Sequence, residues 1–326
     1  MRPKRKNRFD VVTVGTLNAD VIIIGDAPGK VEELVEWVAP SRVELTAAGS
    51  VGYCAIDLAR LGLKVAMLSS VADDALGRLV LEALKSEGVD TEAVKIEKRA
   101  ASGIGVYMLL FGSFKRPLTG RLATHAPWPA RLSHLAEQRL ASARLLHCGG
   151  YLHYESRWGE PTERLYRKAK KLGLITSVDT QFPFAPVKGP WIKLFGNLLD
   201  YVDVIFTDET EAASITGVSD PEAAARELLR AGPRIAVVKM GAQGALLAEK
   251  GRVVHQKAFP VPELTDSIGA GDAFDAGVLY GILAGWPLPR TTRFAAAVSA
   301  LTLPGMGGNR TAPTLKEVNK FLAKRK

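Results

Sequence analysis

The most informative segment of this 326-residue chain is Asp266-Ser-Ile-Gly-Ala-Gly-Asp-Ala-Phe-Asp-Ala-Gly277. Two glycines with one small residue between them lead directly into the apolar segment 270–284, which has the composition of a core helix. Glycine tolerates backbone conformations that direct several N–H groups toward one point. A helix N-terminus adds unpaired amides and a partial positive charge. The segment therefore predicts an anion site suited to a phosphate, or to a phosphoryl group in transfer.

Asp272 lies in the first turn of this predicted helix, beside the anion site. An aspartate at that position has two interpretations, because aspartate is also a common helix-capping residue. Capping does not account for the two glycines or for the second carboxylate at Asp266. We therefore favour a functional role for Asp272.

Upstream of this segment, short apolar strands alternate with helical patterns. Strands separated by helices of this length form parallel sheets with helices on both faces. The last third of the chain is mainly helical. The predicted strands are 10–15, 64–70, 144–148, 174–179, 202–207 and 234–240, and the predicted helices include 50–61, 75–87, 270–284, 289–301 and 314–324.

Two segments, at about 20–48 and 100–125, depart from this alternation. Both are rich in strand-forming residues, as in 21–25, 41–46 and 104–111. Two such insertions can meet as a small sheet over a cleft, so we predict a lid there. Because no repeat, low-complexity tract or long linker interrupts the chain, we predict one domain over residues 1–326 that carries this lid.

The composition is that of a globular protein, with 47% hydrophobic and 24% charged residues. No apolar run approaches the roughly 18 residues that a membrane-spanning helix needs. The N-terminus has basic residues but no uninterrupted apolar segment after them, so we expect no secretory signal. A soluble, cytoplasmic protein is the expectation.

The net charge of +9 is concentrated at the two ends of the chain, and the remainder carries about +1. A basic tail is usually a solvated, frayed terminus. Salt-sensitive binding to polyanions is an alternative role for these ends, but we expect no specific nucleic-acid function. The basic residues concerned are Arg2, Lys4, Arg5, Lys6, Arg8, Lys324, Arg325 and Lys326.

Several other chemistries lack their sequence patterns. Cys54 and Cys148 belong to no C-x-x-C pair and lie among apolar residues, so buried, reduced thiols are expected. The five histidines show no H-E-x-x-H spacing, which leaves zinc without support. The chain has no G-x-x-x-x-G-K-[ST] motif, no complete dinucleotide fingerprint and no complete nucleophile elbow.

The segment 266–277 closely resembles the second signature of the ribokinase-like (PfkB) carbohydrate kinase family. The resemblance extends in order over nearly the whole chain. Each further fragment is short, and their order and spacing make the match specific. These fragments are Val14–Asp20, Ala48–Gly62, Asp73–Gly77, Asp208–Glu211 and Lys239–Gly244.

The resemblance implies an α/β fold with a mostly parallel central sheet, helices on both faces and a small β lid. It implies ATP and Mg²⁺ as co-substrates and the phosphorylation of an alcohol. In this family the lid often pairs with another subunit's lid, so a homodimer is implied. Asp272 would be the base that accepts the hydroxyl proton, and Gly269, Ala270 and Gly271 would form the anion hole. This assignment agrees with the chemistry, because phosphoryl transfer depends mainly on positioning and on charge stabilisation.

The resemblance assigns the other site residues in three groups. Asn18, Asp20, Gly49 and Tyr53 fall on the side that binds the acceptor. Asp208, Lys239, Gly241 and Gly244 fall on the nucleotide side. Glu211 would serve the metal ion, and Asp266 occupies the position matching the monovalent-cation site, such as one for K⁺, of some relatives.

The chain departs from the family pattern at three of these places. The first signature usually has paired glycines and a later asparagine, where this chain has Ala48 and Tyr53. A phenol cannot reproduce both the donor and the acceptor of an amide, which indicates an unusual acceptor. Asp208 replaces the usual asparagine and adds negative charge near the metal, where carboxylate oxygens suit Mg²⁺. Asp179 alone is kept from a D-x-N-x-R motif, and it is either a site residue or a turn former.

Three functions follow in order of preference. The first is an ATP-dependent kinase of a small sugar or sugar acid. The second is a nucleoside kinase of the same family, since Tyr53 and the aromatic residues Tyr107, Phe111 and Phe114 offer flat surfaces for stacking. The third is a catalytically silent ligand-binding relative, against which the intact Gly-Ala-Gly-Asp272 sequence argues.

Overall fold

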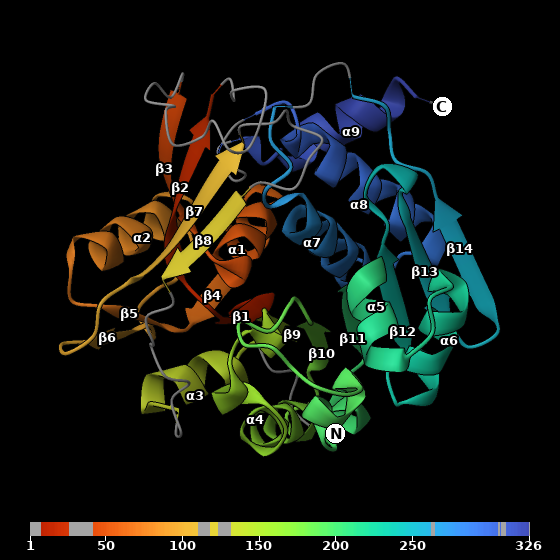
Figure 1. Cartoon of the computed structure of the whole chain (residues 1–326), viewed down its shortest axis with the longest axis horizontal. Helices are drawn as coiled ribbons and strands as arrows, with labels where there is room; N and C mark the ends of the chain where they lie inside the picture. Colours follow the sequence, from red (N-terminus) through yellow and green to blue (C-terminus); the bar gives the residue numbers. More distant parts are fainter. Residues whose placement is uncertain are drawn as a thin grey trace.

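The computed structural model describes residues 8–25, 42–109, 118–122, 132–261, 265–305, 307 and 311–325 (Figure 1). Its centre is an eight-stranded sheet with the strand order β14-β13-β12-β11-β10-β9-β1-β4. The strands from β12 to β4 in this order run parallel. They comprise β1 (Val11–Gly15), β4 (Val65–Leu68), β9 (Leu145–Gly149), β10 (Ile175–Asp179), β11 (Val204–Asp208) and β12 (Ile235–Lys239).

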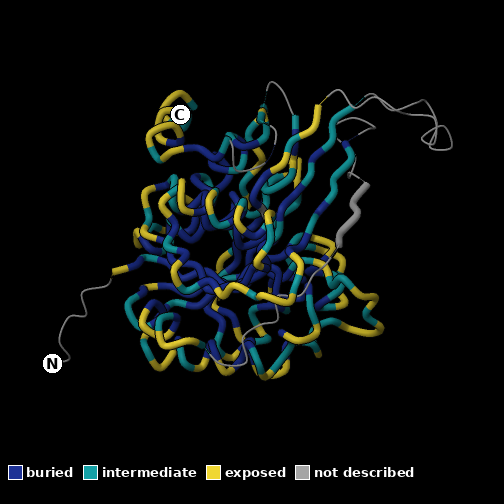
Figure 2. Tube along the Cα trace, turned by 90° about the vertical axis from the view of Figure 1, so that its left-hand side faces the viewer, coloured by how far each residue is buried: buried dark blue, intermediate teal, exposed yellow. Residues whose placement is uncertain are grey.

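These strands are short and apolar because helices cover both faces of the sheet. In β1 all five residues are buried. One face packs against α1 (Ser50–Arg60), α2 (Ala75–Ser86), α7 (Ala270–Leu283), α8 (Leu288–Thr302) and α9 (Leu315–Ala323). The other packs against α3 (His134–Ala141), α4 (Glu160–Lys171), α5 (Glu209–Thr216) and α6 (Pro221–Arg230). Figure 2 shows the buried core between these layers. The predicted fold, a mostly parallel sheet with helices on both faces, is confirmed.

The far edge of the sheet is an antiparallel hairpin that the sequence did not predict. It consists of β13 (Ala245–Glu249) and β14 (Arg252–Gln256), and β13 also runs antiparallel to β12. The turn between them contains Gly251 with φ of 77°. A hairpin needs only a short connection, so no helix marks its presence in the sequence.

The predicted strand 64–70 was too long, because the chain leaves the large sheet at Ser69. The hydroxyl of Ser69 donates to Gly15 O at 2.6 Å, and its carbonyl accepts a bond from Lys95 N at 2.9 Å. These side bonds divide the segment into β4 and β5 (Ser70–Ala72). The latter pairs with β6 (Lys95–Glu97) in a separate two-stranded sheet.

A four-stranded sheet of order β3-β2-β7-β8 stands beside the N-terminal half of the fold (Figure 1). It is built from β2 (Asn18–Ile24), β3 (Arg42–Ala48), β7 (Gly103–Leu109) and β8 (Leu118–Leu122). Its strands therefore come from the two segments that depart from the alternating pattern. We call it the small sheet; its action as a lid, and the extent of the domain over 1–326, stay predictions.

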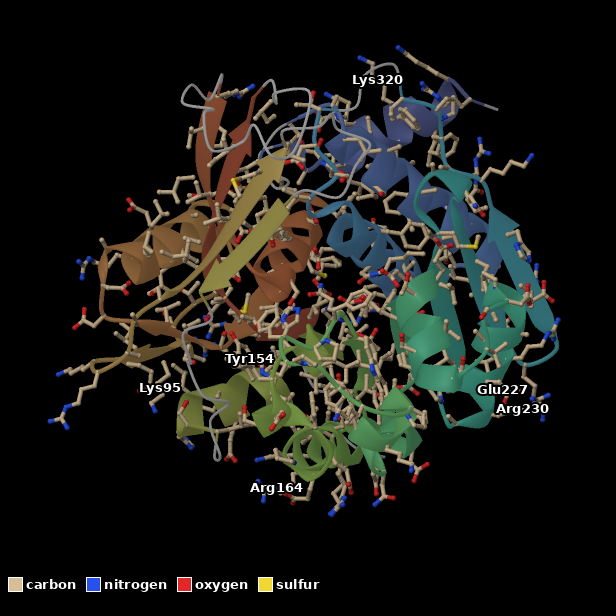
Figure 3. All side chains as sticks on the ribbon, in the orientation of Figure 1. Lys95, Tyr154, Arg164, Glu227, Arg230 and Lys320 are labelled. Carbon is tan, nitrogen blue, oxygen red and sulfur yellow. The ribbon has the colours of Figure 1, made fainter. Side chains whose placement is uncertain are left out.

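Cys54 and Cys148 are buried and unbonded to each other, as expected. Burial raises the pKa of the Cys148 thiol to about 12, which keeps it protonated and unreactive. The surface carries charges of both signs, such as the pairs Arg230–Glu227 on α6 and Arg164–Glu160 on α4 (Figure 3). Over the described residues, no helix combines the length and apolarity that crossing a bilayer requires.

Candidate active site

The predicted anion site lies at the N-terminus of α7. Gly269 is its N-cap residue, with φ of 78°, and no side chain caps this end. The preceding turn is held by Asp266, whose Oδ1 accepts from Ile268 N at 2.8 Å and whose Oδ2 accepts from Gly307 N at 3.1 Å. A buried carboxylate with two backbone donors fixes the loop, so the helix N-terminus keeps one direction.

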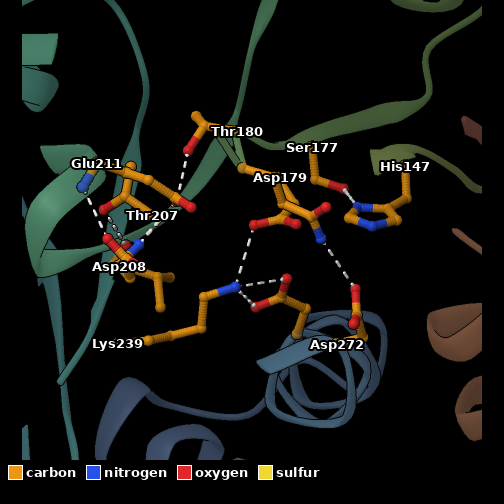
Figure 4. A network of polar contacts seen from close by, with 12 residues as sticks. His147, Ser177, Asp179, Thr180, Thr207, Asp208, Glu211, Lys239 and Asp272 are labelled. Carbon is orange, nitrogen blue, oxygen red and sulfur yellow. Dashed lines mark hydrogen bonds and ion pairs between the residues drawn. The ribbon is translucent and has the colours of Figure 1, made fainter. Parts of the chain in front are cut away.

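Asp272 is partly buried in the first turn of α7. Its Oδ1 accepts a hydrogen bond from Gln181 Nε2 at 3.3 Å (Figure 4). Burial and the nearby Asp179 raise the pKa of Asp272 well above its usual range, and Lys239 opposes this shift. Its carboxylate is therefore more basic than that of an exposed aspartate.

Lys239, at the end of β12, is enclosed by two carboxylates. Its Nζ lies 3.0 Å from Asp179 Oδ1 and 3.0 Å from Asp275 Oδ2 (Figure 4). Burial alone would lower the pKa of Lys239, but Asp179 and Asp275 raise it well above its usual range. The side chain is thus a fixed positive charge that joins β10, β12 and α7. Asp179 is thus joined to Lys239 within the candidate site; its role as a site residue stays a prediction.

His147 on β9 lies beside this network and makes a hydrogen bond through Nδ1 to Ser177 Oγ at 3.0 Å (Figure 4). Burial lowers the pKa of His147 to about 4, so the ring is neutral at physiological pH. It also packs edge-on against Phe206, at 6.0 Å between ring centroids. Its surroundings are those of a packed core histidine.

Asp208 and Glu211 form a capping box at the N-terminus of α5. Glu211 N donates to Asp208 Oδ1 at 2.7 Å, and Asp208 N donates to Glu211 Oε2 at 2.9 Å. Thr180 Oγ1 also donates to Glu211 Oε2, at 2.8 Å. Burial, followed by the charges of Asp208 and Asp179, raises the pKa of Glu211 to about 8. Both acids therefore have a capping role, and both also line a cavity.

Two cavities meet at this place. The first, which we call the polar cavity, has a volume of about 360 Å³ and is lined by several polar side chains, including Gln181, Asp208, Glu211 and Asp272. The second, of about 690 Å³, is mostly apolar. Both are lined by Lys239, Gly241 and Gly271. The walls of the second also include Gly244, Ala258, Phe259, Pro260, Ser267, Ala270, Phe274, Ala296, Ser299 and Ala300.

The residues predicted to bind the acceptor gather where β2 meets α1. Tyr53 OH donates to Asp20 Oδ2 at 3.0 Å, and the amide of Asn18 donates to Asp20 Oδ1. Burial and Asp20 raise the pKa of Tyr53 well above its usual range. Gly49, with φ of 89°, is the N-cap residue of α1, and a Cβ there would lie 2.2 Å from Thr16 O.

Asp20 is almost fully enclosed, with 1% of its surface exposed. Gly105 of β7 is the cross-strand partner of Asp20 within the small sheet, and a Cβ on Gly105 would lie 2.2 Å from Asp20 Oδ1, so the carboxylate lies directly over this glycine. Tyr107 of the same strand packs with Ile22, Leu109 and Ile268. The small sheet thereby contacts the loop that leads into α7.

Some residues singled out from the sequence lie outside the described part of the chain. They comprise the aromatic residues Phe111 and Phe114 and the basic residues at positions 2–6 and 326, and nothing is described of the Ala48 side chain.

Sequence reasoning missed several residues of this site. Asp275 stands inside segment 266–277 but was not singled out, although an acidic residue in an apolar helix is a signal of a buried partner. Gln181 has no recognisable signal. The walls of the larger cavity at 258–261 and on α8 are ordinary apolar residues in the sequence.

A sequence profile described as "pfkB family carbohydrate kinase" matches residues 8–315. The 5-dehydro-2-deoxygluconokinase of Geobacillus thermodenitrificans is 26% identical over 285 residues, which cover 84% of this chain and 83% of the relative. The 5-dehydro-2-deoxygluconokinase of Clostridium perfringens is 26% identical over 333 residues, covering 98% and 95%.

Solved structures share the fold. A PfkB protein from Polaromonas superposes with a TM-score of 0.72 at 27% identity, covering 95% of this chain and 99% of that one. The ribokinase of Arabidopsis thaliana, in complex with ribose and ATP, gives 0.79 at 24% identity, covering 96% and 98%. A putative ribokinase II from E. coli, in complex with ATP and Mg²⁺, gives 0.81 at 20% identity, covering 97% and 99%.

Proposed function

The chain belongs to the pfkB family of carbohydrate kinases and is an ATP-dependent carbohydrate kinase, and we propose that it phosphorylates a hydroxyl of a small sugar acid. Relatives that match 84% and 98% of the chain bear the name 5-dehydro-2-deoxygluconokinase, which favours a sugar acid over a neutral sugar. The observation that carries the mechanism is Asp272. It is a carboxylate of raised pKa that lines the polar cavity at the point where the apolar cavity joins it.

Asp272 acts as the general base in this proposal. Its carboxylate accepts the proton of the acceptor hydroxyl as the new bond to phosphorus forms. A raised pKa makes it a better proton acceptor, provided that it is ionised when the hydroxyl binds. Lys239 keeps a positive charge nearby and supports the ionised form.

The anion hole comprises the backbone at Gly269, Ala270 and Gly271. The backbone amide of Ala270 already donates to Ser267 O at 3.2 Å, so it contributes least of the three to binding the transferring phosphoryl group. Gly269 and Gly271 have no such bond within the described residues, and Gly271 borders both cavities. Their amides, together with the partial positive charge of the α7 N-terminus, stabilise the transferring group without reorganising.

The nucleotide lies along the two joined cavities, with its base in the apolar one and its phosphates near Lys239, Gly241 and Gly244. Glu211 and Asp208 offer hard carboxylate oxygens at the polar end, which suits Mg²⁺. No group of three or more acidic, histidine or cysteine ligands occurs among the described residues. In proteins, Mg²⁺ is usually held by one or two carboxylates together with phosphates and water. When bound, Mg²⁺ neutralises charge on the phosphates.

Asn18, Asp20, Gly49 and Tyr53 form the acceptor end of the proposed site. Asn18 is the most accessible of the polar side chains there, whereas Asp20 and Tyr53 are buried and bonded to each other. Asp266 stands next to this end and is proposed to serve a monovalent cation. Its two oxygens accept from the backbone N–H groups of Ile268 and Gly307, and a carboxylate has further lone pairs that can bind an ion.

We also propose that the protein is a homodimer formed through the small sheet. Val43 and Leu45 on β3 are 54% and 41% exposed, and such neighbouring apolar side chains on one strand face mark a contact surface. A cytoplasmic location stays a prediction.

A panel of acceptors tests the proposed function. ADP formation from MgATP is followed with ribose, fructose, inositol, nucleosides, 2-dehydro-3-deoxygluconate and 5-dehydro-2-deoxygluconate. The largest kcat/KM is expected with a sugar acid. Turnover confined to nucleosides would establish the alternative, a nucleoside kinase. With the best acceptor, Asp272→Asn is expected to lose at least about 100-fold in kcat. Near-normal turnover of this variant would remove Asp272 from the base role.

A further inference from the structure

Gln181 stands in an unusual backbone conformation at the edge of the site. Its φ is 53°, and among the described residues it is the one non-glycine residue with a positive φ. This left-handed conformation is unfavourable for a residue with a Cβ atom. Such conformations persist where the surroundings impose them, and they concentrate at functional sites.

The neighbours of Gln181 impose that conformation from both sides. Thr180, just before it, donates through N to Phe206 O at 3.1 Å and accepts through O from Leu152 N at 2.9 Å. On the other side, Phe184 stacks on His153 with 4.2 Å between ring centroids, and Phe184 N donates to His153 O at 3.3 Å. The loop after β10 is thus held at both ends, and Gln181 lines the polar cavity.

The Gln181 side chain makes one defined contact there. Nε2 donates to Asp272 Oδ1 at 3.3 Å (Figure 4). Only the amide nitrogen can face a carboxylate, because the amide oxygen would repel it. The contact therefore orients the amide as well as the carboxylate.

Other charged and titratable groups face Asp272 without holding it in this way. Lys239 on β12 donates to both Asp179 on β10 and Asp275 on α7. Asp57 and Cys54 approach from α1. Within the described chain, no side chain besides Gln181 donates a hydrogen bond to the Asp272 carboxylate.

We propose that Gln181 is the positioning residue of the base. It holds Oδ1 of Asp272, which leaves Oδ2 for the proton of the acceptor hydroxyl, and it favours the ionised carboxylate by donating a hydrogen bond to it. This inference rests on the proposed role of Asp272 as general base.

Three variants of Gln181 separate the amide from the backbone. Gln181→Leu removes the donor and keeps much of the size. Gln181→Glu replaces the donor with a like charge. Gln181→Gly removes the side chain and relieves the left-handed strain, so it folds even if the leucine variant does not. Phe182→Leu is the matched control, because Phe182 belongs to the same loop and packs edge-on against Trp191 at 5.6 Å.

The measurement is kcat as a function of pH with MgATP and the best sugar acid of the panel. For Gln181→Leu and Gln181→Gly we expect kcat at pH 7 to fall about tenfold, with both KM values within about twofold. The apparent pKa that describes the acid limb of the kcat profile should increase by roughly half to one unit in these two variants, and by more in Gln181→Glu. Phe182→Leu should keep the profile of the wild type.

The coupling to Asp272 is measured without any acceptor, in a double-mutant cycle. Thermal denaturation of Gln181→Leu, Asp272→Asn and the double variant should give non-additive shifts in Tm. Additive shifts together with a wild-type pH profile in Gln181→Leu overturn the proposal, and so does an equal shift of the acid limb in Phe182→Leu. If Asp272→Asn keeps its turnover, the base assignment fails first; if it loses turnover while Gln181→Leu behaves as wild type, only the role of Gln181 fails.

Discussion

At Asp272, the surroundings favour the protonated carboxyl, whereas the proposed reaction needs the ionised one. Burial and Asp179 raise its pKa, and Lys239 counteracts them. Because the ammonium of Lys239 already pairs with Asp179 and Asp275, it only partly offsets the rise in the pKa of Asp272. A carboxylate whose pKa is raised in this way takes up a proton readily, but its ionised form lowers the stability of the folded protein.

That cost leads to a prediction for Asp272→Asn. An aspartate with a raised pKa binds its proton more tightly in the folded state than in the unfolded state, so its contribution to stability declines as the pH rises above about 4. We expect the variant to gain about 1 kcal/mol in free energy of unfolding at pH 7 relative to wild type, although its kcat falls. The gain should grow between pH 4 and 7. Thermal denaturation over this range measures it, and a difference that does not vary with pH contradicts the raised pKa.

Tyr53 is a second residue of the candidate site whose substitution has a predictable effect. The Tyr53 hydroxyl donates to Asp20 Oδ2 at 3.0 Å. It therefore occupies a lone pair of Asp20 to which a hydroxyl of the sugar substrate would otherwise donate. We expect Tyr53→Phe to favour acceptors with one more hydroxyl. The kcat/KM ratio of 5-dehydrogluconate to 5-dehydro-2-deoxygluconate should rise several-fold, by about 1 kcal/mol of discrimination.

The KM for ATP serves as the internal control, because Tyr53 lines neither of the two described cavities that meet at Lys239. It should stay within about twofold of wild type. An unchanged acceptor ratio with a normal KM for ATP would falsify the role of Tyr53 in specificity.

At the scale of single elements, local pattern predicted most helices and strands well. The helix predicted over 50–61 is α1 (Ser50–Arg60), and that over 270–284 is α7 (Ala270–Leu283). Their ends depend on glycines and on the apolar period, which are local features. The break at Ser69 depends instead on a hydroxyl that reaches Gly15, 54 residues earlier. A contact of that span leaves no trace in a window of ten residues.

The difference between local features and long-range contacts also explains which residues of the candidate site could be predicted from the sequence. Segment 266–277 predicted the α7 N-terminus because glycines and a following apolar run are contiguous. The partners of Lys239 come from β10 and α7, and the sequence order does not pair them. Gln181 was missed because its conformation is imposed by the bonds that its neighbour Thr180 makes to Phe206 O and accepts from Leu152 N.

At the N-terminus of α5, the capping role of Asp208 can be separated from the effect of its charge. Asp208 caps the helix and also places a second carboxylate next to Glu211. Asparagine caps as well as aspartate does, so Asp208→Asn should keep the stability of the wild type, whereas Asp208→Ala should lose about 1 kcal/mol. Removing the charge in either variant lowers the pKa of Glu211 from its value of about 8.

Enzyme kinetics at varied Mg²⁺ concentration separates the two roles of Asp208. If its charge attracts the metal, both variants should need several-fold more Mg²⁺ for half-maximal rate, to the same degree. If it acts through capping alone, only the alanine variant should change. Chemical denaturation supplies the matching stabilities, and equal losses for both variants would contradict the capping argument.

Over the whole molecule, function depends on segments brought together by the parallel sheet. Asp179 ends β10 and Lys239 ends β12, and they meet because the carboxyl ends of parallel strands share one edge. Gly271, in the first turn of α7, lines the same two cavities as Lys239. The sequence predicted these segments individually. It did not predict that residues 258–261 and α8 close the apolar cavity, since nothing but apolar character distinguishes them.

The small sheet has two different faces. Ile22, Leu109 and Tyr107 turn toward Ile268 and the site. Val43 and Leu45 lie on the opposite face, paired with Ile23 and Val21 of β2. Because side chains alternate along a strand, this outer face is apolar over at least two strands.

Burying such a face requires a second protein surface, and the same face on another copy is self-complementary under twofold symmetry. We therefore expect a dimer in solution, which Val43→Glu together with Leu45→Glu dissociates. Ile96→Glu is the matched control, because Ile96 is 53% exposed but belongs to the separate two-stranded sheet. Light scattering coupled to size-exclusion chromatography at micromolar concentrations gives the masses. Since stable dimers bury about 1,200–2,000 Å², two like charges per subunit in that area should shift the dissociation constant by at least about 100-fold. A monomeric wild type, or equal dissociation by the control variant, excludes the small sheet as the interface.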